Sequence, residues 1–191
     1  MGSTHFDFGY GIVVDSIGNV YTTGLFQDTV DFDPGAGVTD LVSIGFQDTF
    51  ISKLDSNGDY VWAKSMGGIN LDSGVDIALD SYGNVYTMGV FMDTVDFDPG
   101  AGTTNLISAG NKDTFLSKLD SHGDYIWAKS IGGTDLDYGT SIALDVSGNI
   151  HMAGYFYGTA DFDPGAGIAN LISGEVISSF PNLRMIPSHR L

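Results

Sequence analysis

The sequence has no cysteine, one glutamate, two glutamines and only seven lysines and arginines among 191 residues. The absence of cysteine excludes disulfides, thiolate zinc sites and cysteine nucleophiles. The residues that usually cover exposed helix surfaces are scarce, whereas 27 glycines and 23 aspartates favour turns. This composition predicts an all-β fold, and a hydrophobic fraction of 42 % is enough to fill a core.

The chain also lacks positive charge, with a formal net charge of −17 and a pI near 4.1. Nucleic acid and anionic lipid bind clustered lysine and arginine, so neither is expected as a partner. No apolar run approaches the ~20 residues that span a bilayer, so membrane insertion is not expected. Residues 1–7 have neither the basic nor the apolar region of a signal peptide. We therefore expect either a cytoplasmic protein or an excised piece of a longer one.

A repeat of 65 residues organises the chain. The sequence Asp-Phe-Asp-Pro-Gly-Ala-Gly occurs unchanged at 31–37, 96–102 and 161–167, and residues 2–66 match residues 67–131 without a gap at 42 of 65 positions. Such self-similarity indicates copies of one structural unit. The predicted units are 2–66, 67–131 and a partial third unit, 132–174, followed by a divergent tail at 175–191.

Each unit reads as two β-hairpins. The turn pattern Asp-x-x-Gly-[Asn/Asp] recurs between apolar runs, with its aspartates at Asp15, Asp55, Asp80, Asp120 and Asp145. In the second unit the predicted strands are 76–80, 84–91, 113–120 and 125–131. Residues 92–112 form an excursion between the hairpins, read as a short extra strand or a packed loop, with Val95 and Phe97 facing inward.

Four antiparallel strands per unit predict a β-propeller blade, because a blade buries both faces against its neighbours and is not stable alone. The predicted fold class is all-β, with four-stranded antiparallel blades in an incomplete, open propeller. Two full units and part of a third do not close a ring, which takes at least ~4 blades.

Several linked motifs resemble the seven-bladed β-propeller repeat family often labelled SBBP. In the second unit they are residues 77–86 (IALDSYGNVY), 94–100 (TVDFDPG), 113–120 (DTFLSKLD) and 127–129 (WAK). The resemblance covers residues 2 to about 174. It implies a blade from a secreted or surface-attached bacterial protein without assigned enzymatic activity, and it supplies no catalytic residues. The tail departs from the pattern, and we expect a truncated or frame-shifted end there, or else a separate docking segment.

The best candidate site is the Asp-x-Asp pair before each Pro-Gly turn. The six residues are Asp31, Asp33, Asp96, Asp98, Asp161 and Asp163. Alternate residues of an extended segment project to one face, and carboxylates with nearby carbonyls suit Ca²⁺. The alternative is that these carboxylates accept hydrogen bonds from backbone N–H groups in Asx turns, and this alternative is favoured. Ca²⁺ is the only cofactor that the sequence suggests.

For two further groups of residues, the sequence favours a structural role. Asp7, Asp72 and Asp137 lie in the connections between units, where a turn or a blade-to-blade hydrogen bond is favoured over a ligand site. Tyr60, Trp62, Tyr125 and Trp127 alternate along a strand, which indicates packing between blades rather than a sugar platform. His5, His122, His151 and His189 are scattered and give no metal or catalytic pattern.

The predicted function is a non-enzymatic scaffold or binding module, extracellular or at the cell surface by family resemblance. Its expected partners are other blades or chains, proteins or glycans. A nucleophile elbow, a P-loop, a dinucleotide fingerprint and a zincin helix are all absent from the sequence. One alternative is a structural protein that self-assembles through exposed blade faces, as a homo-oligomeric ring or a filament. Another is a hydrolase or lyase that uses paired aspartates in the channel.

Overall fold

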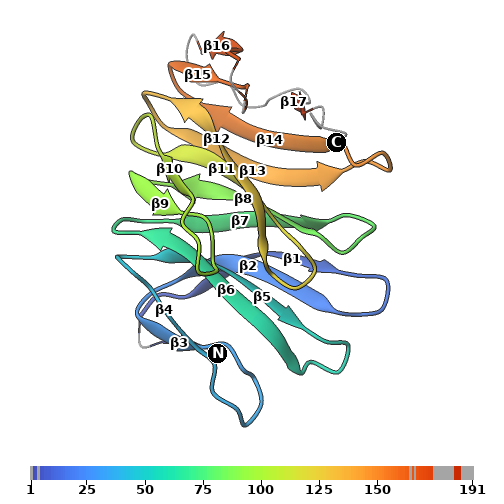
Figure 1. The fold of residues 1–191 in the computed structure, drawn as a ribbon. Coiled ribbons are helices and arrows are strands. Elements are labelled where there is room, and N and C mark those ends of the chain that lie inside the picture. The colour runs from blue at the N-terminus through green and yellow to red at the C-terminus, as the bar shows by residue number, and fades with distance from the viewer. Residues whose placement is uncertain (1, 4, 164, 166, 174–182, 186–191) are drawn as a thin grey trace.

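The computed structural model describes the chain except for residues 1, 4, 164, 166, 174–182 and 186–191. The described residues form strands and turns and no helix, so none of them belongs to a helix that is long and apolar enough to cross a membrane. Three blades follow one another along the chain, from the blue N-terminal end to the orange C-terminal end of Figure 1. The predicted all-β class and the open arrangement of blades are both confirmed.

The strands recur in the same order in each unit. The first unit contains β1 (Phe8–Val14), β2 (Val20–Phe26), β3 (Thr29–Asp31), β4 (Asp40–Val42), β5 (Asp48–Leu54) and β6 (Tyr60–Gly68). The second contains β7 (Ser73–Leu79), β8 (Val85–Phe91), β9 (Thr94–Asp96), β10 (Asn105–Ile107), β11 (Asp113–Leu119) and β12 (Tyr125–Gly133). The third contains β13 (Asp137–Leu144), β14 (Ile150–Phe156), β15 (Thr159–Asp161) and β16 (Asn170–Ile172), with β17 (Leu183–Met185) in the tail.

Four of these strands form each complete blade, paired antiparallel in the order first, second, fifth and sixth. Blade 1 is β1-β2-β5-β6, blade 2 is β7-β8-β11-β12, and blade 3 is β13-β14 with β17. The strands agree closely with the predicted ones. The main difference is β7, which begins at Ser73 rather than at residue 76, because a β-bulge between Gly74 and Asp76 interrupts its alternation.

The excursion in each unit is a second, smaller hairpin, here called the outer hairpin: β3–β4, β9–β10 and β15–β16. The outer hairpin of one unit pairs with the last strand of the preceding blade. Gly67 and Gly68 of β6 pair with Asp96 and Val95 of β9, and β12 pairs with β15 in the same way. Each of these two hairpins therefore extends the sheet of its neighbour and ties two blades together.

The core lies between the blades. The largest cluster joins Tyr21, Ile51, Trp62 and Met66 of blade 1 to residues of the second unit that include Ile77, Phe91, Val95, Phe97 and Phe115. A second cluster joins Tyr86, Met88, Leu116 and Ile131 of blade 2 to the third unit. The inward orientation predicted for Val95 and Phe97 is confirmed, since both side chains are buried. Blade-to-blade packing is thus the main source of hydrophobic burial.

Candidate functional site

The aspartates of the repeated Asp-Phe-Asp-Pro-Gly motif organise the loop of each outer hairpin. Asp31 Oδ1 accepts hydrogen bonds from the backbone N–H groups of Asp33 (3.0 Å) and Thr39 (2.8 Å), and Asp33 Oδ1 accepts one from Gly35 (2.7 Å). The other two loops repeat this pattern with distances of 2.7–3.0 Å. Gly37 leaves room for the Asp33 carboxylate, which a Cβ there would displace.

These hydrogen bonds favour the turn interpretation of the motif. Donation by the Thr39 N–H lowers the pKa of Asp31, and donation by the Ala169 N–H lowers that of Asp161. Within the described part of the chain, no group of three or more His, Cys, Asp or Glu side chains is arranged to hold a metal ion. The calcium site assigned to Asp31, Asp33, Asp96, Asp98, Asp161 and Asp163 stays a prediction, and carbonyls or water would have to complete its ligands.

The hairpin aspartates are turn formers, as predicted. In all five turns the carboxylate accepts from the backbone N–H groups two and four residues later, at 2.8–3.0 Å. The glycine of each turn has a positive φ of 78–91°, a conformation that glycine adopts without steric cost. In the third unit, hydrogen bonding by Asn149 is the main reason that the pKa of Asp145 falls to about 2.

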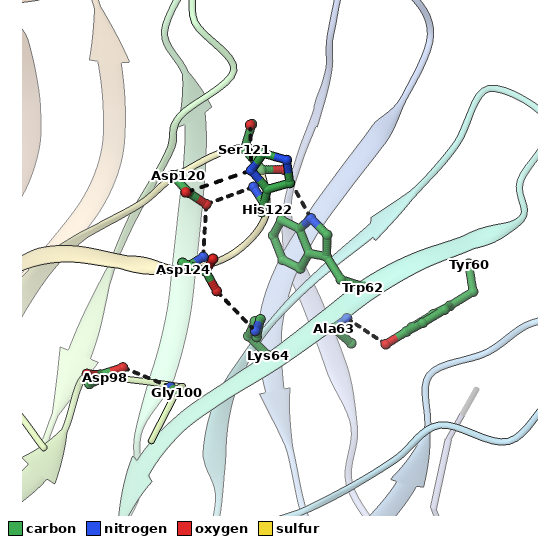
Figure 2. Close-up of polar contacts among 10 residues, drawn as sticks. All are labelled: Tyr60, Trp62, Ala63, Lys64, Asp98, Gly100, Asp120, Ser121, His122 and Asp124. Carbon is green, nitrogen blue, oxygen red and sulfur yellow. Dashed lines mark hydrogen bonds and ion pairs between the residues drawn. The ribbon is translucent and has the colours of Figure 1, made fainter. Parts of the chain in front are cut away.

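A hairpin of blade 2 rests on the last strand of blade 1 (Figure 2). The Trp62 indole N–H donates to the carbonyl oxygen of Ser121 (3.2 Å), and Lys64 Nζ lies 3.8 Å from Asp124 Oδ1. Gly123 fits between them, since a Cβ there would stand 2.9 Å from Lys64 Cε. Trp62 is buried and also contacts Tyr21 edge-on. This confirms packing between blades as the role of the aromatic strand.

Asp72 and Asp137 connect neighbouring blades, as the blade-to-blade interpretation predicted. Asp72 Oδ2 accepts from the N–H of Gly68 at the end of β6 (2.8 Å), and its Oδ1 accepts from Met92 just after β8 (3.1 Å). Asp137 Oδ2 accepts from Gly133 at the end of β12 (2.6 Å). The equivalent Asp7 accepts from Ser3 and Gln27. Asp72 and Asp137 thus join the end of one blade to the next, whereas the donors to Asp7 belong to its own unit.

Sequence reasoning missed a second carboxylate at each junction. Asp48 and Asp113 begin the third strand of their blades, and parallel bridges from Gln47 to Leu71 and from Lys112 to Leu136 place them beside Asp72 and Asp137. All four side chains are buried, since these residues are only 0–3 % exposed. The sequence feature that could have indicated them is an aspartate at the same repeat position in two units, directly before an apolar strand.

The two carboxyl groups of a junction lie close together. A Cβ built on Gly132 would stand 2.6 Å from Asp113 Cγ and 2.9 Å from Asp137 Oδ2, so both groups lie against the same backbone atom. Burial, with a smaller contribution from the charge of Asp48, raises the pKa of Asp72 to about 7. Burial and the charge of Asp113 raise the pKa of Asp137 to about 6. Burial also raises the pKa values of Asp48 and Asp113.

The outward face of blade 1 is apolar and exposed. Beyond the β-bulge between Gly9 and Gly11, Ile12 and Val14 lie on one face of β1 and are 67 % and 56 % exposed. The same repeat position holds Ile12, Ile77 and Ile142, which are 67 %, 4 % and 6 % exposed respectively. Ile77 and Ile142 lie in the clusters that join each blade to the preceding one. The face of β1 is therefore a blade-packing surface that no described residue covers.

The described histidines form no site together. Each lies next to an aspartate: His5 next to Asp28, His122 next to Asp120 and His151 next to Asp145. His189 lies outside the described residues. The prediction that the histidines serve no metal or catalytic site stays a prediction.

Comparison with known proteins gives distant repeat-protein similarities. No protein-family model matches the chain. It is 26 % identical over 121 residues to an uncharacterized WD repeat-containing protein of Acanthamoeba polyphaga mimivirus, and the aligned region covers 56 % of this chain and 9 % of that protein. It is 28 % identical over 145 residues to the regulatory protein FlaEY of Caulobacter vibrioides, and the aligned region covers 74 % of this chain and 15 % of that protein. With the observed sheets, these similarities indicate a β-propeller-like repeat.

Proposed function

We propose that this chain is a non-enzymatic, propeller-type scaffold that binds protein partners by stacking blades. The exposed Ile12 carries this proposal, because Ile77 and Ile142, at the same repeat position, are buried against a preceding blade. A partner for this surface needs a flat apolar sheet face, such as the one that Tyr21, Ile51 and Met66 present to Ile77. Another blade of the same repeat has this chemistry, and the simplest source of one is a second copy of the chain.

The regular use of the junction residues supports a structural role. Asp72 and Asp137 make corresponding hydrogen bonds at the two junctions, and β9 and β15 pair with the preceding blade at corresponding positions. An active site needs a set of catalytic residues that one unit has and the other units lack. The described residues instead repeat their interactions from unit to unit. The names of the two relatives, a WD repeat-containing protein and a regulatory protein, also favour a binding role.

Three finer features belong to the same proposal. Membership of the SBBP repeat family and a location outside the cell or at its surface are supported by the repeated motifs of the sequence. Calcium would stiffen the outer hairpins at the Asp-x-Asp loops. Glycans are a second class of partner for the acidic surface.

Light scattering after size exclusion, at several concentrations, tests the stacking proposal. We expect the average mass to rise with concentration for the unmodified chain, and the rise to be abolished by Ile12→Asp, which places a charge in the apolar face. Val146→Asp is the matched control, because Val146 is fully exposed at a hairpin turn away from this face. A monomer at all micromolar concentrations, or an equal effect of the two substitutions, would refute assembly through blade 1.

A further inference from the structure

Two buried carboxyl groups lie close together at each junction between blades, and at least one oxygen of each pair lacks a hydrogen-bond donor. Asp48 Oδ2 accepts from the N–H of Ile44 (2.9 Å), and Asp113 Oδ2 accepts from that of Ala109 (2.8 Å). The other oxygen of each group, Oδ1, is buried and has no donor among the described residues. Oδ1 of Asp137 has none either. A buried acceptor without a donor costs about 1–3 kcal/mol.

The charge on each pair is also uncompensated. Across the described residues, no lysine, arginine or histidine forms an ion pair with Asp48, Asp72, Asp113 or Asp137. The other charged groups that act on these pairs are also carboxylates, Asp93 near Asp72 and Asp135 near Asp137. Two adjacent carboxylates that are both ionised in a buried site repel each other strongly, so one of them retains a proton.

A proton fits this site better than a metal ion. Calcium requires 6–8 oxygen ligands, whereas the oxygens here already accept from the backbone N–H groups of Gly68, Met92, Ile44 and Ala109. Donor hydrogens that point into a site repel a cation. A proton needs only two oxygens, and it would supply the missing donor to the orphan Oδ1 atom.

We propose that the two carboxyl groups at each junction share one proton, so that each junction is a proton-binding site that strengthens blade-to-blade packing below neutral pH. At the first junction the shared proton lies between Asp72 and Asp48. At the second junction it lies between Asp137 and Asp113. When the proton leaves, two negative charges face each other across the junction and push the blades apart.

The direction of the pH effect follows from the raised pKa values. Asp72 and Asp137 titrate at about 7 and about 6 in the folded chain, against ~3.9 for an ordinary aspartate. The folded state therefore binds more protons than the unfolded state between about pH 4 and pH 7. Their stabilisation is complete below the unfolded pKa and is lost as the pH rises through the folded pKa. For each titrating junction, the unfolding equilibrium constant rises by up to about tenfold per pH unit in that window.

Urea unfolding of the full chain between about pH 5 and pH 8 tests the proposal. We expect the urea midpoint of the unmodified chain to fall as the pH rises. In the double variant Asp48→Asn, Asp113→Asn one charge of each pair is gone and the amide N–H₂ can donate to the remaining carboxylate, so the fall should be much smaller. Asp59→Asn, at an exposed hairpin tip, is the matched control and should keep the dependence of the unmodified chain.

Carbon-13 NMR of the aspartate carboxyl groups gives a reading that does not depend on a variant's folding. We expect the Asp72 carboxyl of the unmodified chain to titrate near neutral pH, and to titrate at lower pH in Asp48→Asn. Titration of all four carboxyl groups near pH 4 would overturn the proposal, as would an unchanged pH slope in the double variant. If Ca²⁺ at pH 8 raised the urea midpoint of the unmodified chain but not that of the double variant, the ligand would be a cation and the proton proposal would be wrong.

Discussion

Replacing Ile77 by alanine should weaken the contact between blades 1 and 2, and Ile12→Ala supplies an internal control. The two isoleucines occupy the same repeat position in equivalent strands, but Ile77 is 4 % exposed and Ile12 is 67 % exposed. Removing the side chain of a buried isoleucine typically costs about 2–5 kcal/mol, from lost transfer energy plus a residual cavity. Replacing an exposed strand isoleucine costs at most about 1 kcal/mol, mainly through strand propensity.

Ile142→Ala provides a second, independent measurement at the other junction. Ile142 is 6 % exposed and packs in the cluster that joins blades 2 and 3, so its replacement should also cost about 2–5 kcal/mol. For a chain of this size each kcal/mol lowers Tm by roughly 2–4 °C, so both buried variants should melt about 4–20 °C lower.

Urea unfolding followed by tryptophan fluorescence is a suitable assay, because Trp62 lies in the same cluster as Ile77. The experiment is run at low protein concentration, so that stacking through the face of Ile12 does not contribute. Equal losses of stability for Ile12→Ala and Ile77→Ala would refute the reasoning, because the first residue would then be buried too. A loss below about 1 kcal/mol for both buried variants would equally contradict blade packing as the source of stability.

Two other changes test local features of the repeat. Gly89→Ala should destabilise the chain by about 1–3 kcal/mol in urea unfolding, because a Cβ there would stand 2.0 Å from the Ser73 carbonyl oxygen and 2.6 Å from the Phe115 ring. Gly9→Ala should be tolerated, because a Cβ on Gly9 would have no neighbouring atom within 4 Å. The calcium hypothesis predicts that the free energy of unfolding is higher in Ca²⁺ than in EGTA, by up to about 2.7 kcal/mol when free Ca²⁺ is at a hundredfold excess over Kd. The Tm should rise accordingly. Asp96→Asn with Asp98→Asn should reduce that gain, and equal melting in Ca²⁺ and EGTA would remove the ion.

The blade itself could be predicted because its signals are local. Each turn aspartate stands two and four residues before the N–H groups that it binds, as Asp80 does for Tyr82 and Asn84. Alternation of apolar residues then places the strands, and the identity of the repeated units shows that the blades are alike. The inward orientation of Val95 and Phe97 followed from the same alternation.

The contacts between units could not be predicted, because they depend on which strands meet in space. Nothing local indicates that β9 pairs with Gly67 and Gly68 of the preceding blade. The buried pair Asp48 and Asp72 was missed for the same reason. An aspartate at the start of a strand reads as a turn residue, and only the parallel bridge between the segments before them shows that the two carboxyl groups meet.

Pairing of each outer hairpin with the preceding blade explains why a unit carries about 20 residues more than its four blade strands need. The last strand of a blade would otherwise present unpaired N–H and C=O groups, which are a template for uncontrolled strand addition. In this chain β9–β10 covers the end of β6, and β15–β16 covers the end of β12. Gly68 at the end of β6 allows this approach, since a Cβ there would collide with the backbone of Thr94. Each new repeat therefore covers the end of the last strand of the repeat before it, and its own Asp-Phe-Asp-Pro-Gly loop holds the covering hairpin in shape.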